Sequence, residues 1–148
     1  RDVDCSCPVP VRRRYLARLS GPLLDRVDIR VHLHPISAMD CYAVRSPDTT
    51  AVVRQRVIAA RERAVARWAA YGWRTNAEVP GPKLRTEFAL PHGATAALAR
   101  ALARGALTAR GADRCLRLAW TLADLEGLEI PTSSEVGIAM DFRERVAA

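Results

Sequence analysis

Hydrophobic and polar positions follow two different periods along this chain. Between residues 27 and 34 apolar and polar residues alternate, which is typical of a half-buried β-strand, and Pro35 ends the alternation. From Thr49 onward apolar residues recur every three or four positions, which is typical of amphipathic helices. The pattern therefore predicts one strand in the N-terminal part and a longer helical part behind it.

Start and stop residues accompany the helical period. Gly72 is a natural C-cap, Thr108 is a good N-cap, and Thr132 or Ser133 can cap the last helix with Glu135 in its first turn. Helices are expected over residues 8–19, 49–70, 82–88, 91–104, 108–127 and 133–145. The expected fold is mainly α: a helical bundle preceded by a helix, a corner and a strand.

A short helix and a corner precede the alternating segment. Pro22 suits a first helical turn because its φ is fixed and it has no N–H to satisfy, and Leu23 and Leu24 are expected to anchor that turn in a core. Arg26 then lies where the helix becomes a strand, so an anchored backbone could aim its guanidinium at an anion. The alternative is a surface arginine paired with a flanking aspartate.

The helix expected over residues 49–70 carries an apolar stripe and a basic flank. The stripe consists of Val53, Val57, Ala60, Ala64 and Trp68. Arg56, Arg63 and Arg67 line up along one side of it. This flank could follow the phosphates of DNA or face a neighbouring subunit, or it could only solubilise the helix with stems lying along apolar surface.

Composition narrows the class of protein. The chain has 148 residues, of which 49% are hydrophobic and 5% aromatic, and this favours tightly packed helices over a β-sandwich. It shows neither a signal peptide nor an apolar run long enough to cross a membrane. We expect an intracellular, cytoplasmic fragment with one domain, or one domain plus an appendage, and no membrane partner.

The net charge of +7 has two explanations. Lys83 is the only lysine, so almost all the positive charge comes from arginine. Arginine offers a planar fork for phosphate, yet a GC-rich genome also enriches arginine and alanine. Charge alone therefore leaves nucleic-acid binding open.

No group of cysteines or histidines completes a metal site. Cys5 and Cys7 can form at most half of a structural zinc site, which needs four ligands, and free thiols in a reducing compartment are the alternative. His32 and His34 share one face of the expected strand, but no third ligand is evident nearby. We expect these histidines to bind no metal.

The segment Leu23-Leu-Asp-Arg26-Val-Asp28 resembles the Leu-Leu-Asp-Arg-hydrophobic-Asp segment of magnesium-chelatase-like AAA+ ATPases. Within that group it is most similar to the bacterial competence-type (ComM/YifB) proteins, regarded as hexameric DNA branch-migration helicases. The resemblance implies that Arg26 is an arginine finger, acting in trans on a nucleotide bound by the neighbouring subunit. It also implies that Cys5 and Cys7 pair with an upstream cysteine pair as half of a zinc site.

A second motif carries the same resemblance. Leu107-Thr-Ala-Arg110, then Arg114, then Arg117-Leu-Ala-Trp-Thr-Leu-Ala-Asp124-Leu is similar to the family's sensor-2 helix. The resemblance implies that Arg110 is the sensor-2 residue, which reaches the γ-phosphate in cis, and that Arg114 contributes more weakly to phosphate binding. Asp113 departs from the family pattern. From spacing alone it is expected to pair with Arg117.

The resemblance also implies a domain plan and a set of partners. Residues 1–48 would be the end of an AAA+ core, and residues 49–148 its helical lid. Because no phosphate loop and no acidic magnesium motif are found, ATP and Mg²⁺ are expected only for the full-length protein, a hexameric ring acting on DNA. Two alternatives stay open: the lid of a magnesium chelatase subunit, and a stand-alone basic helical module that binds DNA. The strand is expected to pair with another copy or to be poorly ordered.

Overall fold

The computed structural model describes residues 6–31, 33 and 48–144, and in these residues every regular element is helical. The mainly α prediction is therefore confirmed. In chain order the elements are α1 (Val9–Leu16), α2 (Gly21–Leu24), α4 (Thr50–Trp68), the 3₁₀ turns η2 (Ala69–Tyr71) and η3 (Asn76–Glu78), α5 (Gly81–Arg85), α6 (His92–Ala103), α7 (Ala109–Glu126) and α8 (Ser133–Glu144).

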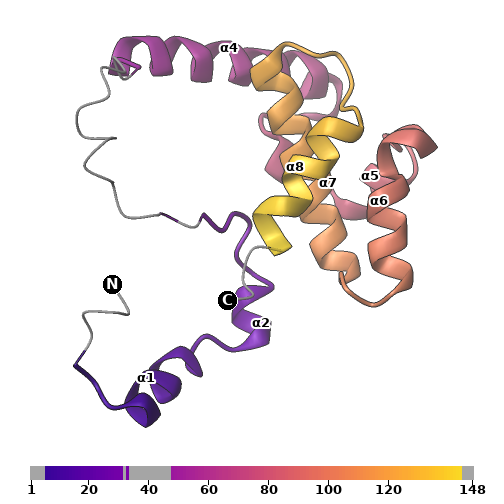
Figure 1. Cartoon of the computed structure of the whole chain (residues 1–148). Helices are drawn as coiled ribbons and strands as arrows, with labels where there is room; N and C mark the ends of the chain where they lie inside the picture. The colour runs from indigo at the N-terminus through magenta and orange to yellow at the C-terminus, as the bar shows by residue number, and fades with distance from the viewer. Residues whose placement is uncertain (1–5, 32, 34–47, 145–148) are drawn as a thin grey trace.

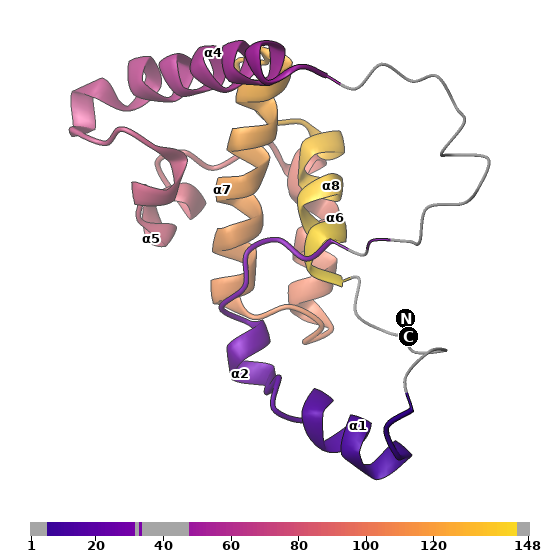
Figure 2. The same ribbon diagram turned by 90° about the vertical axis from the view of Figure 1, so that its left-hand side faces the viewer.

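Helix α7 is the centre of the bundle. It packs against α4, α5, α6 and α8, and α6 also packs against α8 (Figure 1 and Figure 2). Its ends follow local chemistry: Thr108 Oγ1 accepts the Gly111 N–H at 3.0 Å, and Gly127 ends the helix with a φ of 75°. Small buried residues such as Ala112 and Ala119 let the neighbouring helices approach closely.

Five aromatic residues form one cluster beside α7: Trp68, Tyr71, Trp73, Phe88 and Trp120. Trp68 is 1% exposed, and its ring centroid lies 4.8 Å from that of Phe88 and 5.5 Å from that of Trp120. Trp68 Nε1 donates to Asn76 Oδ1 at 2.8 Å, so the buried indole is satisfied. This cluster joins α4 to α7 and to the segment that carries α5.

The predicted stripe on α4 is only partly buried. Ala60, Ala64 and Trp68 are in the core, but Val53 and Val57 are 44% and 39% exposed. The reason is that α4 crosses one end of α7, so its N-terminal half extends beyond the bundle (Figure 1). A period in the sequence marks which residues share a face, but not how much of that face another helix covers.

Helix α8 begins with the expected capping box. Glu135 Oε2 accepts the Thr132 N–H at 2.8 Å and the Thr132 hydroxyl at 2.7 Å, while Thr132 Oγ1 accepts the Ser134 N–H at 3.2 Å. These hydrogen bonds favour the ionised carboxylate, mainly through the Thr132 side chain, and they lower the pKa of Glu135.

The strand predicted over residues 27–34 is wrong for the residues that the structure describes. Residues 27–31 and 33 have no strand, because strand pairing needs an adjacent strand and no described segment supplies one. The backbone instead contacts the bundle, with the Arg30 N–H donating to Phe142 O at 2.9 Å. The expected core anchor is also wrong at Leu23, which is 45% exposed.

Candidate functional site

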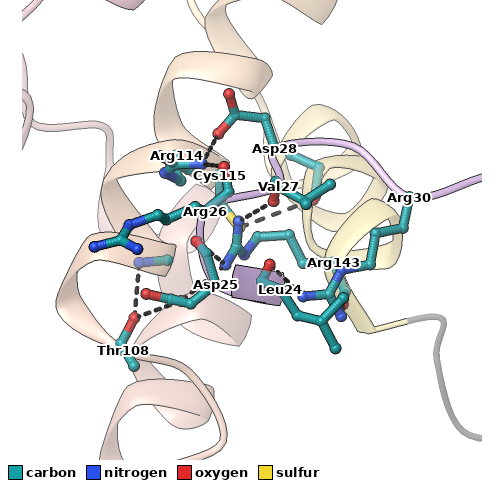
Figure 3. A network of polar contacts seen from close by, with 12 residues as sticks. Leu24, Asp25, Arg26, Val27, Asp28, Arg30, Thr108, Arg114, Cys115 and Arg143 are labelled. Atoms are coloured by element: carbon teal, nitrogen blue, oxygen red, sulfur yellow. Dashed lines mark hydrogen bonds and ion pairs between the residues drawn. The ribbon is translucent and has the colours of Figure 1, made fainter. Parts of the chain in front are cut away.

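The site is centred on the corner that follows α2, here called the Arg26 corner (residues 25–28). The corner lies against the first turns of α7 and the last turn of α8 (Figure 3). Segments more than 80 residues apart in the sequence therefore meet at one place, as the separations of 83 and 116 residues between bonded partners indicate.

Asp25 connects this corner to both helices. Its Oδ1 accepts the Thr108 hydroxyl at 3.1 Å and Arg143 Nη2 at 3.0 Å. The same Thr108 oxygen caps α7 by accepting the Gly111 N–H. The corner is therefore bonded to the N-cap of the helix that carries Arg110 in its first turn.

Arginine side chains hold the backbone of the corner. Leu24 O accepts Arg30 Nη2 at 2.5 Å, Asp25 O accepts Arg143 Nη2 at 3.3 Å and Val27 O accepts Arg143 Nη1 at 2.9 Å. Arg26 O accepts a bond from Arg114 Nη1. The carbonyl groups of four successive residues, 24–27, are thus bonded by guanidinium groups, which fixes the path of the chain here.

The Arg26 side chain makes no such contact. It is exposed, and its guanidinium has no hydrogen bond or ion pair with any described residue. Figure 3 shows it extending away from Arg143. The predicted pairing with a flanking aspartate does not form, because Asp25 pairs with Arg143 and Asp28 pairs with Arg114 at 2.5 Å.

The arginines of α7 have different surroundings. Arg110 is exposed in the first turn, and its guanidinium is unbonded within the described part of the chain. Arg114 is engaged with Asp28 and the Arg26 carbonyl, and its side chain is 21% exposed. In this structure Arg114 holds the corner, and the weaker phosphate contact predicted for it stays a prediction.

The predicted pair between Asp113 and Arg117 is wrong. Arg117 donates from Nε and Nη2 to Val79 O at 3.0 and 2.9 Å, and Asp113 pairs with Arg85. Both side chains instead contact the segment that carries η3 and α5, which packs beside α7.

The arginines on the basic flank of α4 differ in how strongly they are bonded to the rest of the bundle. Arg67 makes a bidentate ion pair with Asp124, with Nη2–Oδ1 and Nη1–Oδ2 distances of 2.5 and 3.2 Å, and Arg63 Nη1 donates to Asp124 O at 2.6 Å. Arg56 forms only an exposed pair with Asp48 at 3.1 Å. Arg63 and Arg67 therefore fasten α4 to α7, whereas the DNA or subunit contact predicted for this flank stays a prediction.

Sequence reasoning missed Asp25, Arg30 and Arg143 as parts of the site. Their partners lie far away in the sequence, and nothing in the local spacing distinguishes them from surface charges. Cys5, His32 and His34 lie outside the described residues, so the zinc half-site and the absence of a histidine metal site stay predictions. Within the described ranges, no group of three or more potential metal-ligating side chains is arranged to hold an ion.

Two family models match the chain. Magnesium chelatase, subunit ChlI C-terminal, matches residues 47–143, and magnesium chelatase, subunit ChlI, matches residues 1–41. The chain belongs to the magnesium chelatase ChlI family. The sequence motifs indicate the competence-type branch of magnesium-chelatase-like AAA+ ATPases. This is confirmed, because YifB and ComM are similar to most of the chain.

Several curated proteins are similar to this member of the ChlI family. An uncharacterized protein of Mycobacterium tuberculosis, Rv2897c, is 50% identical over 141 residues, which are 95% of this chain and 28% of that protein. YifB of Escherichia coli is 34% identical over 88% of the chain and 25% of its own length. The competence protein ComM of Haemophilus influenzae is 32% identical over 90% of the chain and 26% of its own length. The chain thus spans about a quarter of the length of these relatives.

Proposed function

We propose that this chain supplies an arginine finger and a helical lid to the ATPase centre of a magnesium-chelatase-like AAA+ motor. Arg26 would contact a nucleotide bound by the neighbouring subunit, and Arg110 would contact the nucleotide of its own subunit. The proposal is supported by a contrast between arginine side chains. Those of Arg30, Arg114 and Arg143 bond to residues 24–28. Those of Arg26 and Arg110 are exposed and make no bond within the described residues.

Both arginines suit a phosphate ligand. A guanidinium stays charged at all physiological pH values and presents a planar set of donors that matches phosphate oxygens. Bound ATP supplies the phosphoryl group that is transferred, and charge develops on its oxygens in the transition state. The role of this chain's residues is to place donors where that charge develops, and a fixed backbone around Arg26 reduces the reorganisation that this requires.

The other parts of the ATPase centre are not found in this chain. It has no Gly-x-x-x-x-Gly-Lys-Ser/Thr phosphate loop. The described residues also hold no cluster of carboxylates for Mg²⁺. Hydrolysis would then take place in a cytoplasmic ring of full-length copies, a hexamer by analogy with the family. Other segments of the protein would supply the phosphate loop and the Mg²⁺ ligands, and this chain would supply the arginines.

We favour movement of DNA as the process that ATP hydrolysis drives. The net charge of +7 and the similarity to a competence protein support an anionic polymer as partner. Insertion of magnesium is the second candidate, because the matching family model is described as a magnesium chelatase subunit. DNA-stimulated ATP hydrolysis by the full-length protein would favour the DNA motor, and hydrolysis that does not respond to DNA would favour the chelatase.

The arginine assignments can be tested in the assembled full-length protein. Arg26→Ala should lower kcat for ATP hydrolysis by about 10³- to 10⁵-fold while nucleotide binding stays close to that of the parent. Arg110→Ala should lower hydrolysis as well. Arg104→Ala is the matched control, because Arg104 is another exposed arginine, at the end of α6, and its loss should leave kcat unchanged. A parental rate in Arg26→Ala would show that the finger assignment is wrong.

A further inference from the structure

We propose that Arg143, in the last turn of α8, is a positioning residue for Arg26. This inference rests on the proposed function of Arg26 and adds a residue to it. The Arg143 side chain is only 6% exposed, and the residue lies 116 positions from Val27, which it contacts. A buried guanidinium at the end of a lid helix is costly unless partners are provided, so its contacts indicate what it is for.

All the hydrogen bonds that the Arg143 side chain makes within the described residues go to the Arg26 corner. Its Nη2 donates to the Asp25 carboxylate at 3.0 Å and to Asp25 O at 3.3 Å, and its Nη1 donates to Val27 O at 2.9 Å. Its Nε has no partner there. One guanidinium therefore holds the backbone on both sides of Arg26, and it contributes no hydrogen bond to the rest of the bundle.

Arg30 ties the same two segments together in the opposite direction. Its N–H donates to Phe142 O at 2.9 Å and its Nη1 to Arg143 O at 3.2 Å, while its Nη2 donates to Leu24 O at 2.5 Å. The last turn of α8 thus gives bonds to the Arg26 corner and receives bonds from Arg30, two residues beyond it. Such a closed set of contacts restrains the corner more than a single ion pair would.

Removal of the Arg143 guanidinium would free the corner on both sides of Arg26. Val27 O would lose its donor, and the Asp25 carboxylate would keep only the Thr108 hydroxyl. Arg26 itself would remain, with its charge unchanged and its carbonyl still bonded to Arg114, but its position would be less restrained. A misplacement of about 1 Å in a positioned catalytic group can lower a rate by about 10²-fold. The defect should appear at the neighbour's nucleotide, because that is where Arg26 is proposed to act.

The first test compares steady-state kinetics in the full-length assembly. Arg143→Gln should lower kcat by about 10²-fold and leave the KM for ATP within about twofold of the parental value. The kcat of Arg143→Lys should lie between those of the parent and Arg143→Gln. An ammonium group keeps the charge, but it cannot bond to Asp25 and Val27 at once as the planar guanidinium does. Asp25→Asn, which keeps an acceptor but removes the charge partner, should give a smaller loss of kcat of the same kind.

A mixed assembly separates positioning from a damaged lid. Arg143→Gln subunits are combined with subunits that carry a disabled phosphate loop but an intact Arg26 corner. Because the variant's own nucleotide site is sound, a neighbour with an intact corner should restore part of the hydrolysis. A lid that is simply destabilised would harm the variant's own site, and mixing would then restore nothing.

The matched control is Arg117→Gln. Arg117 is also a partly buried arginine that donates to a backbone carbonyl, at Val79 in the same bundle, but it makes no bond to the corner. It should lose thermal stability without a selective loss of kcat.

If Arg143→Gln has parental kcat, or if mixing fails to restore activity, the positioning role is wrong. If Arg26→Ala is fully active, the proposed function fails first; if Arg26→Ala is inactive and Arg143→Gln is normal, only this inference fails.

Discussion

The ion pair between Arg67 and Asp124 should be the largest single polar contribution to the stability of the bundle. The Asp124 side chain is 1% exposed, and it is held by the two guanidinium bonds of Arg67 and by Asn76 Nδ2 at 2.8 Å. Arg67→Ala would leave this buried carboxylate with too few donors. The removal of one partner of a buried pair costs about 3–5 kcal/mol, a large part of the roughly 5–15 kcal/mol by which a domain is stable.

Part of that loss would come from packing, and a second variant separates the two contributions. The Arg67 guanidinium lies 4.5 Å from the ring centroid of Trp120, a cation–π contact worth about 0.5–2 kcal/mol. Arg67→Met keeps an apolar stem against the tryptophan but leaves Asp124 without its charge partner. It should therefore retain most of the destabilisation if the buried charge is the cause.

The assay is urea unfolding of the 148-residue chain at pH 7, followed by circular dichroism at 222 nm. Arg56→Ala is the control on the same flank of the same helix. Its pair with Asp48 is 57% and 59% exposed, so its loss should cost less than about 1 kcal/mol. Equal free energies of unfolding for Arg67→Ala and Arg56→Ala would refute the conclusion that Arg67 fastens α4 to α7.

Two further predictions concern helix ends. Hydrogen bonds lower the pKa of Glu135 below its ordinary 4.5. The capping box therefore contributes stability above about pH 4.5 and loses it as the pH falls through the lowered pKa. The unfolding midpoints at pH 7 and pH 3 should differ more in the parent than in Glu135→Gln, and equal differences would contradict this. Gly127→Ala should destabilise the chain by about 1–2 kcal/mol, because the backbone φ at this residue is 75°. Gly137→Ala, in an open position within α8, should instead stabilise the chain by up to about 1 kcal/mol. A shift of the thermal unfolding midpoint in the same direction for both variants would argue against the left-handed cap.

The helices could be predicted because their signals are local. The N-cap at Thr108, the capping box at Glu135 and the three- and four-residue period all lie within a few positions of the structure they specify. The strand over residues 27–34 could not be judged in this way, since alternation describes one chain segment and says nothing about a neighbour to pair with. The exposure of Val53 has the same origin, because it depends on where α7 ends beneath α4.

The candidate site shows the same limit more sharply. Arg110, Arg114 and Arg117 follow one another along one helix, yet one is unbonded within the described chain, one holds the corner and one holds Val79. Nothing in their spacing distinguishes these surroundings. The resemblance to a family indicated Arg26 and Arg110, but the role proposed for Arg143 rests on contacts across 116 and 118 residues, and these contacts exist only in the folded chain.

The measurement that tests the central claim most directly is ATP hydrolysis by mixed assemblies of the full-length protein. Arg26→Ala subunits, expected to be inactive alone, are combined with subunits that have a disabled phosphate loop and their own Arg26. If Arg26 acts on a neighbour's nucleotide, some interfaces then pair a sound site with a sound finger, and hydrolysis should rise well above that of either protein alone. Arg110→Ala, mixed with the same partner, should show no such recovery, because its defect stays with the nucleotide that it binds. Hydrolysis by Arg26→Ala alone at the parental rate, or no recovery in its mixture, would contradict the account.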